Sequence, residues 1–179
     1  MPKPTDTKRR IQAVARELFA RQGVRKTSLQ EIANRLGITK PALYYHFSSR
    51  EELVRSIVQP LIDDGEAFLS RQEALGAIEP RALLEEYFDF TYGHRDVIVL
   101  VLAELTTLAE LGLFDLVLAW RERIVALLCG PEPTLAEATR AVVALGGLQD
   151  CTIQFPDAPL EELRRATVNA ACAALGIQP

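Results

Sequence analysis

Histidine is scarce in this sequence, and its scarcity removes several kinds of chemistry at the outset. Only His46 and His94 occur among the 179 residues, and they fall in different predicted domains. A histidine-based metal site or catalytic cluster is therefore not expected. The sequence also lacks GxSxG, HExxH, P-loop and GxGxxG motifs. We expect a protein that is not an enzyme and that needs no cofactor and no metal ion.

Cysteine is almost as rare. Cys129, Cys151 and Cys172 are odd in number, widely separated and without a CxxC pair, which argues against a disulfide framework and against a zinc site. We interpret them as small apolar packing residues. A redox-sensing role for one of them is the alternative, although nothing nearby in the sequence is suited to lower the pKa of a thiol.

Long apolar runs are also absent. The longest, Val97 to Ala103, is far too short to cross a bilayer, and Met1-Pro-Lys-Pro lacks the apolar core of a secretion signal. We therefore expect a cytoplasmic protein with no membrane partner. A hydrophobic content of 49% is nevertheless enough for a core, in one medium domain or two small ones.

Charge is divided unevenly along the chain. Residues 1–55 hold 12 Lys and Arg against 5 Asp and Glu, a net charge of +7, whereas residues 56–179 hold 8 against 19, a net charge of −11. This asymmetry indicates a basic N-terminal part that meets a polyanion and an acidic remainder that does not. Chance segregation of solvated faces is the alternative.

Apolar residues recur at helical spacing almost everywhere and strand signals are nearly absent, so we predict an all-α fold of about nine helices. The first helix ends at Gly23, and a capping box of Ser28 and Glu31 opens a second helix that ends at Gly37. Ser48 and Ser49 start a long fourth helix, with a kink or break expected near Pro60. The remaining helices are predicted at about 81–92, 96–108, 113–128, 134–153 and 158–175.

The third helix is short, about Lys40 to His46. Thr39 can cap it, because a threonine hydroxyl accepts hydrogen bonds from the free N–H groups of a first turn. Two short helices joined by a tight glycine turn make a helix-turn-helix, in which Leu43 and Phe47 face inward. Lys40, Tyr44 and one edge of Tyr45 then point outward.

Such a helix fits the major groove of DNA and its flanking phosphates. Lys40 can donate to guanine, and Pro41 or Ala42 can contact a thymine methyl group. Tyr44 and His46 are better placed for phosphates, and Arg50 adds charge at the start of the fourth helix. The residues that open the second helix, where it would cross the sugar-phosphate backbone, are Thr27, Ser28 and Gln30.

Residues 8–55 resemble the DNA-binding domain of TetR-type transcriptional repressors. The similarity includes LFARQG in the first helix, TSLQEIA in the second, LGITKPALYYHF across the turn and third helix, and SSREEL at the start of the fourth. The resemblance assigns base reading to Lys40, Pro41, Ala42, Tyr44, Tyr45 and Gln30. It assigns phosphate contacts to Thr27, Ser28, Thr39, Tyr44, His46 and Arg50.

The resemblance also implies two domains, a helix-turn-helix domain over 1–55 and a helical effector-binding and dimerization domain over 56–179. The last two predicted helices are rich in alanine and glycine, which let helices approach closely, so we expect them to form a four-helix bundle in a C2 homodimer. Two copies would then read successive major grooves of a palindromic operator. The alternative is that these alanines pack only within one subunit.

A pocket for a small-molecule effector is a further expectation from the resemblance. Its predicted lining is Phe68, Phe88, Tyr92, Glu104, Thr107, Trp120 and Arg121. An aromatic stripe at helical spacing is, however, also typical of a plain core. Together these features predict a homodimeric repressor that a small apolar or amphipathic ligand releases from its operator. The alternatives are an activator, a helical protein-interaction module that retains a helix-turn-helix, or a small helical enzyme.

Overall fold

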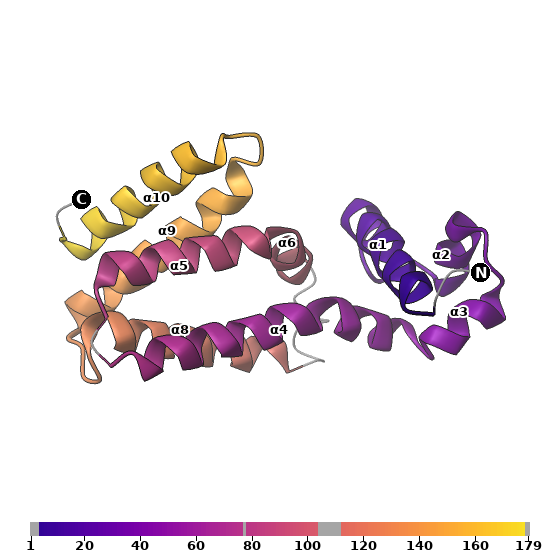
Figure 1. Cartoon of the computed structure of the whole chain (residues 1–179), viewed down its shortest axis with the longest axis horizontal. Helices are drawn as coiled ribbons and strands as arrows, with labels where there is room; N and C mark the ends of the chain where they lie inside the picture. The colour runs from indigo at the N-terminus through magenta and orange to yellow at the C-terminus, as the bar shows by residue number, and fades with distance from the viewer. Residues whose placement is uncertain (1–3, 77, 104–111, 178–179) are drawn as a thin grey trace. The chain divides into compact units, whose positions relative to one another are not determined.

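The computed structural model describes residues 4–76, 78–103 and 112–177 of the chain, and within these ranges it is entirely helical apart from turns and loops. Figure 1 shows the nine helices that lie in the described residues. They are α1 (Pro4–Gln22), α2 (Leu29–Leu36), α3 (Lys40–His46), α4 (Arg50–Ala74), α5 (Pro80–Gly93), α6 (Arg95–Ala103), α8 (Leu113–Cys129), α9 (Leu135–Gln154) and α10 (Leu160–Leu175). The prediction of an all-α fold with about nine helices is confirmed.

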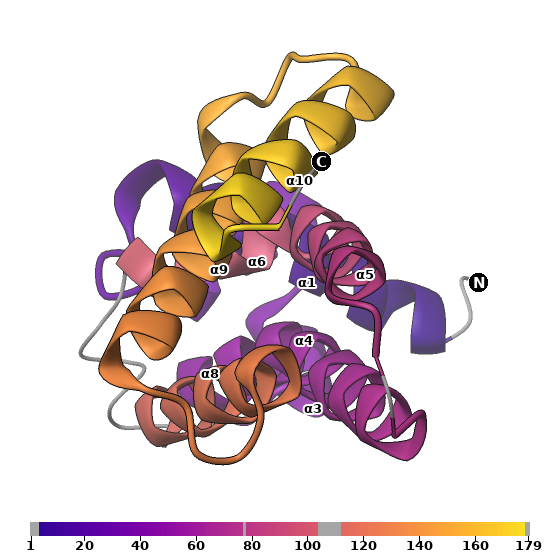
Figure 2. The same cartoon turned by 90° about the vertical axis from the view of Figure 1, so that its left-hand side faces the viewer.

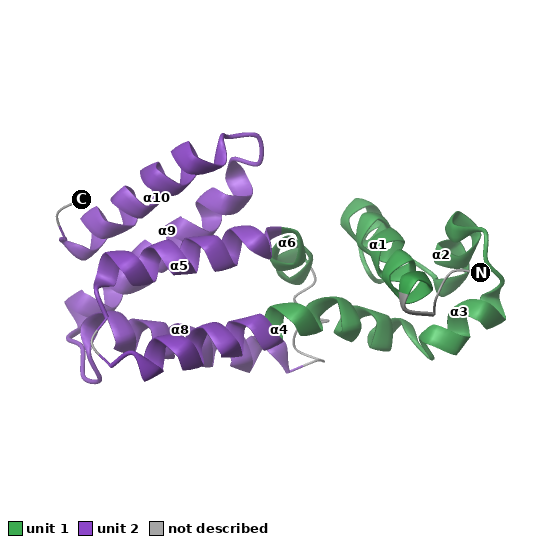
Figure 3. Ribbon diagram, in the orientation of Figure 1, with its two compact units in different colours: residues 1–62, 96–111 green, residues 63–95, 112–179 purple. Residues whose placement is uncertain are grey.

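The chain divides into two compact units (Figure 3). The first contains residues 1–62 and 96–111, and the second contains residues 63–95 and 112–179. The helix α4 contributes to both units, because the division falls after Ile62. This helix continues through Pro60 without interruption, so the expected break is absent.

Helix ends in the first unit follow the local sequence closely. Gly37 ends α2 in a left-handed conformation with φ of 67°, which glycine adopts without a Cβ penalty. Ser28 caps α2 by accepting a hydrogen bond from the Glu31 N–H at 3.1 Å. The predicted capping box is only half formed, because both carboxylate oxygens of Glu31 instead accept from Gln22 Nε2, at 3.0 and 2.9 Å. This hydrogen bonding ties α2 to α1.

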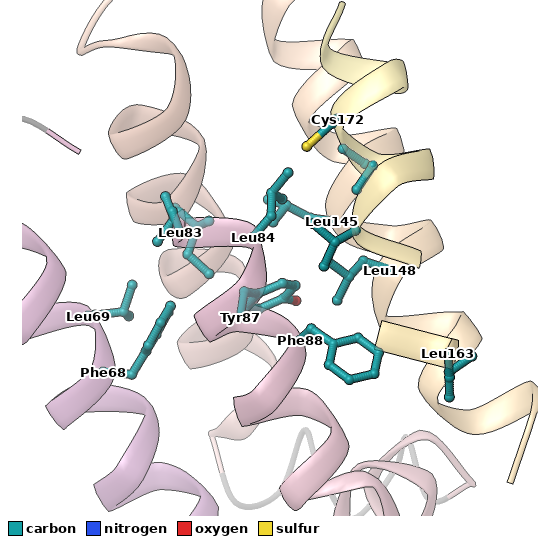
Figure 4. Close-up of a cluster of buried hydrophobic side chains, with 14 residues drawn as sticks. Phe68, Leu69, Leu83, Leu84, Tyr87, Phe88, Leu145, Leu148, Leu163 and Cys172 are labelled. Atoms are coloured by element: carbon teal, nitrogen blue, oxygen red, sulfur yellow. The ribbon is translucent and has the colours of Figure 1, made fainter. Parts of the chain in front are cut away.

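The second unit is built around α5, which packs against α9 and α10. Figures 1 and 2 show α9 and α10 lying side by side, and α8 packs on α9. Figure 4 shows how α4, α5, α9 and α10 contribute to one buried cluster. Its labelled members are Phe68, Leu69, Leu83, Leu84, Tyr87, Phe88, Leu145, Leu148, Leu163 and Cys172. Cys172 is fully buried, as expected for a packing residue.

Close approach at Gly65 joins α4 to α8 in the same unit. A Cβ atom added to Gly65 would lie 2.3 Å from Cη2 of the Trp120 ring. The Trp120 indole N–H donates to Glu66, and Arg123 donates to both Glu66 and Glu73. The backbone conformation does not require glycine at position 65, because its φ is not positive. Glycine is required there by packing, because Trp120 occupies the space of a Cβ atom.

We expect Gly65→Ala to lower the free energy of unfolding by about 1–3 kcal/mol, because the added methyl group overpacks the contact with Trp120. Urea denaturation measures this change. Gly93→Ala is the matched control, since no atom lies within 4 Å of its added Cβ, and it should leave stability unchanged or slightly raised. Equal stability of the two variants would contradict the packing argument.

Candidate nucleic-acid interface

The helix α3 has one buried and one exposed face. Leu43 and the C-cap residue Phe47 are 0% and 1% exposed, as predicted from their spacing. Tyr45 is 82% exposed, and Tyr44 is also exposed. The Lys40 ammonium lies 5.6 Å from the centroid of the Tyr44 ring, so cation and aromatic face share the outer surface. This outer surface is free to meet a partner.

Caps hold both ends of α3 in place. The hydroxyl of Thr39 accepts from the Ala42 N–H at 3.3 Å, which confirms it as the N-cap. After the other end, Ser48 donates from its N–H and its hydroxyl to Glu52, at 2.7 and 2.6 Å, and the Ser49 hydroxyl accepts from the Glu52 N–H in the first turn of α4. The hydrogen bonds from Ser48 lower the pKa of Glu52 below its usual value. The short helix is thus fixed between two capped junctions.

Two further contacts bring basic residues next to α3. The Arg50 guanidinium donates to the Arg25 carbonyl oxygen at 3.1 Å, which places the start of α4 against the turn before α2. The Lys8 ammonium lies 5.4 Å from the centroid of the Phe47 ring. Cationic side chains from α1 and from the start of α4 therefore lie near the C-terminal end of the short helix and the turn before α2.

The remaining predicted DNA-contacting residues differ in exposure. Those that are exposed are Ser28, Gln30, Thr39, Lys40, Pro41, Ala42, Tyr44 and Tyr45, and those of intermediate exposure are His46 and Arg50. Thr27 is buried, and its hydroxyl donates to the Gly23 carbonyl oxygen at 2.8 Å and accepts from Gln22. Its N–H donates to the Val24 carbonyl oxygen. Thr27 thus uses its polar groups inside the unit.

The predicted effector residues differ in burial and in the side chains that they pack against. Phe68 and Phe88 are buried, whereas Tyr92, Trp120 and Arg121 are partly exposed. Phe88 stacks on Tyr92 with ring centroids 5.7 Å apart, and Trp120 packs on Phe90. Glu104 and Thr107 lie outside the described residues. Among the described residues of this set, Phe68 lines a groove between α4 and α5.

Several polar contacts were not anticipated from the sequence. Glu66 is held by Trp120 and Arg123, and these hydrogen bonds lower the pKa of its carboxyl group. Burial raises the pKa of Tyr87 to about 12. The seven-residue spacing of Glu66 and Glu73 predicts that they share one face of α4. Their hydrogen-bonding partners, however, lie on α8, more than forty residues later. No periodicity within one helix identifies a partner at that separation.

Metal and membrane features are not found in the described residues. Within residues 4–76, 78–103 and 112–177, no three His, Cys, Asp or Glu side chains are grouped so that they could hold a metal ion. None of the helices described is both long enough and apolar enough to span a membrane.

Comparison with known proteins agrees with this geometry. A capped seven-residue helix with a buried and an exposed face, preceded by α2 and a glycine turn, defines a helix-turn-helix protein. Residues 11–57 match the family model described as bacterial regulatory proteins, tetR family. Over these residues the chain therefore has the DNA-binding part of the TetR family of transcriptional regulators. That family is one of regulators, which agrees with the prediction that the chain is not an enzyme.

Relatives of known name match part of the chain. The transcriptional activator FasR of Mycolicibacterium smegmatis is 35% identical over 91 residues, which cover 49% of this chain and 42% of the relative. The repressor KstR2 of Rhodococcus jostii is 35% identical over 80 residues, 44% of this chain and 38% of the relative. The matched segments thus span less than half the length of these curated relatives.

Solved structures match over nearly the whole chain. A transcriptional regulator from Aquifex aeolicus superposes with a TM-score of 0.71 at 25% identity, covering 92% of this chain and 96% of the other. The TetR-family regulator PfmR from Thermus thermophilus gives a TM-score of 0.64 at 26% identity, covering 90% and 96%. The likeness therefore includes the second unit as well as the helix-turn-helix.

Because α3 has a buried and an exposed face, substitutions on the two faces should differ in how much they change the free energy of unfolding. Leu43→Ala should lower the free energy of unfolding by about 2–5 kcal/mol, because it removes a fully buried side chain. Tyr45→Ala should change it by no more than about 0.5 kcal/mol, because the ring is mostly exposed. Thermal unfolding followed by circular dichroism distinguishes the two, and a large loss for Tyr45→Ala would mean that this ring is structural.

Proposed function

We propose that the protein is a transcriptional repressor that binds a palindromic DNA operator as a homodimer and is released by a small-molecule effector. The observation that carries the proposal is the outer face of α3, where Lys40, Tyr44 and Tyr45 are exposed while Leu43 is fully buried. A structural helix that bound nothing would have no need for an 82% exposed tyrosine beside a lysine. The net charge of +7 over residues 1–55 supports a polyanionic partner.

In this proposal the exposed residues of α3 read bases. Lys40, Tyr44 and Tyr45 enter the major groove, with Pro41 and Ala42 at the exposed N-terminal end of the helix. Contacts to the sugar-phosphate backbone come from the other exposed or partly exposed polar residues, which are Ser28, Gln30, Thr39, His46 and Arg50. Thr27 is left out, because its hydroxyl and N–H already have partners within the unit. Thr27 instead fixes the turn that carries Arg25.

The dimer is proposed to form through α9 and α10. Part of their small-residue content packs within the subunit, since Ala141, Ala144 and Ala171 are buried. Another part is exposed, and it lies beside exposed Val142 and Val143. These exposed small residues are Ala136, Gly147, Ala166, Ala170 and Ala173. An apolar surface with small side chains suits close packing against a second copy.

The effector is proposed to act through the contact between α8 and α4. A small apolar or amphipathic ligand near Phe88, Tyr92 and Trp120 would displace the indole ring from Gly65 and loosen its hydrogen bond to Glu66. Because α4 continues to Arg50 beside α3, such a change can shift the population toward states unable to bind the operator. An inducer that saturated this unit yet left operator affinity unchanged would contradict the coupling.

The DNA-binding proposal is tested with an operator selected from random duplexes by the purified protein. Lys40→Ala should weaken its binding by about 1–3 kcal/mol, and sequence preference should be lost at the contacted base pair. Affinity should also fall steeply with salt. Arg71→Ala removes the same charge from the second unit, and its effect should be much smaller. If no duplex is enriched at low ionic strength, the protein does not read DNA sequence.

Repression is tested with a reporter placed under the selected operator. Deleting the gene should raise reporter expression, because an occupied operator blocks transcription. A fall in expression would identify an activator. The FasR relative is named as a transcriptional activator.

The dimer proposal is tested by Val143→Glu. Val143 is 58% exposed on α9, so a carboxylate there should not disturb the subunit core but should oppose pairing with a second copy. Analytical ultracentrifugation should find a dimer for the parent protein and a monomer for Val143→Glu. Leu75→Glu, at a similarly exposed leucine after α4, should remain dimeric. A monomeric parent protein would contradict the proposal.

A further inference from the structure

An open groove of about 400 Å³ lies between α4 and α5, within the second unit. Its lining residues are Asp64, Ala67, Phe68 and Arg71 from α4, and Glu86, Asp89 and Phe90 from α5. The α4 residues recur at spacings of three and four, so they form one continuous helix face. The volume is within the usual range of small-molecule sites.

The rim of this groove is acidic. The lining residues Asp64, Glu86 and Asp89 contribute three carboxylates, against the guanidinium of Arg71 and that of Arg164, which pairs with Asp89. The wider charge has the same sign, because residues 56–179 carry a net charge of −11. A cation entering the groove is therefore attracted both locally and by the net negative charge of residues 56–179, whereas an anion is repelled.

The carboxylates of Glu86 and Asp64 are held in position without being fully occupied, whereas both oxygens of Asp89 accept from Arg164. Glu86 Oε2 accepts from Gln72 at 2.7 Å and from Arg71 at 3.3 Å, while its Oε1 has no partner among the described residues. The Gln72 side chain that orients it is only 1% exposed. Asp64 Oδ2 lies 3.1 Å from His94 Nε2, and Asp64 Oδ1 is likewise without a partner in the described part of the chain. Two carboxylate oxygens thus remain available.

The floor of the groove is aromatic. Phe68 and Phe90 stack with ring centroids 5.6 Å apart and an interplanar angle of 10°. Figure 4 shows Phe68 pointing from α4 toward α5. Phe68 is buried and Phe90 is partly exposed, so Phe90 offers the accessible ring surface. An aromatic face beside carboxylates attracts a positive charge and gives apolar contact to the group that bears it.

We propose that this groove binds a small organic cation with an attached apolar or aromatic group. The charge would lie between Glu86 and Asp64, and the apolar part would lie on Phe90. A bare metal ion does not suit the same residues, because the described structure groups no three ligating side chains for one. The inference does not depend on DNA binding, since every lining residue belongs to the second unit.

The test measures binding of benzyltrimethylammonium to the full-length chain by isothermal titration calorimetry at low salt. Benzylsulfonate, an anion of similar size, should not bind. Glu86→Gln should weaken binding about two- to fivefold, because it removes one partly exposed charge while keeping the side-chain shape. Phe90→Leu should weaken it by a similar factor, because it keeps apolar volume but removes the ring. Added salt should weaken binding by the parent protein.

Glu122→Gln is the matched control, because it removes the same charge from an exposed position on α8 away from the groove. Its affinity for benzyltrimethylammonium should equal that of the parent protein. Equal weakening by Glu86→Gln and Glu122→Gln, or comparable binding of benzylsulfonate, would overturn the proposal. The proposal would also be overturned if tetralysine bound more tightly than benzyltrimethylammonium and Phe90→Leu did not affect its binding. The groove would then be a site for a basic peptide. Unfolding midpoints of all variants show whether a loss of binding is a loss of fold.

Discussion

The burial of Leu43 and Phe47 is the constraint on which the N-terminal part of the structure depends. A helix of seven residues is far too short to be stable alone, because the cost of its first turn is offset by few hydrogen bonds. Packing of these two side chains supplies the missing stabilisation, and the Thr39 cap satisfies one of the free N–H groups of the first turn. Once the inner face is fixed, the outward direction of Lys40, Tyr44 and Tyr45 follows from helix geometry.

Local signals explain why so much of this unit could be predicted from sequence. Thr39, Ser28 and Gly37 act within three or four residues of the helix ends that they determine, so reading the chain in order finds them. The prediction at Pro60 was wrong where it required a break. Proline removes one intrahelical hydrogen bond, but α4 continues on both sides of it. Buried neighbours such as Ile57, Val58 and Leu61 hold the helix together there.

Contacts between distant residues are the part that the sequence could not reveal. The carboxylate of Glu31 was expected to complete a capping box, yet Gln22 on α1 binds both of its oxygens. Nothing local distinguishes these outcomes, because both partners lie within reach only after α1 and α2 pack. The same holds for Trp120, whose close packing on Gly65 and hydrogen bond to Glu66 could not be predicted from the sequence. Helical periodicity identifies the face of a residue but not the helix that it meets.

The division of charge gives the two parts of the sequence different partners. A net charge of +7 over residues 1–55 favours phosphates, and the proposed DNA contacts on α3 lie in this part of the sequence. A net charge of −11 over residues 56–179 opposes non-specific contact of that part with DNA. Binding of the protein to DNA through that part would therefore not compete with binding through α3. The same negative charge selects against anionic ligands and favours cations at the α4–α5 groove, where Glu86 and Asp64 keep free carboxylate oxygens. One property of the composition therefore separates the proposed DNA-binding part of the sequence from the proposed ligand-binding part.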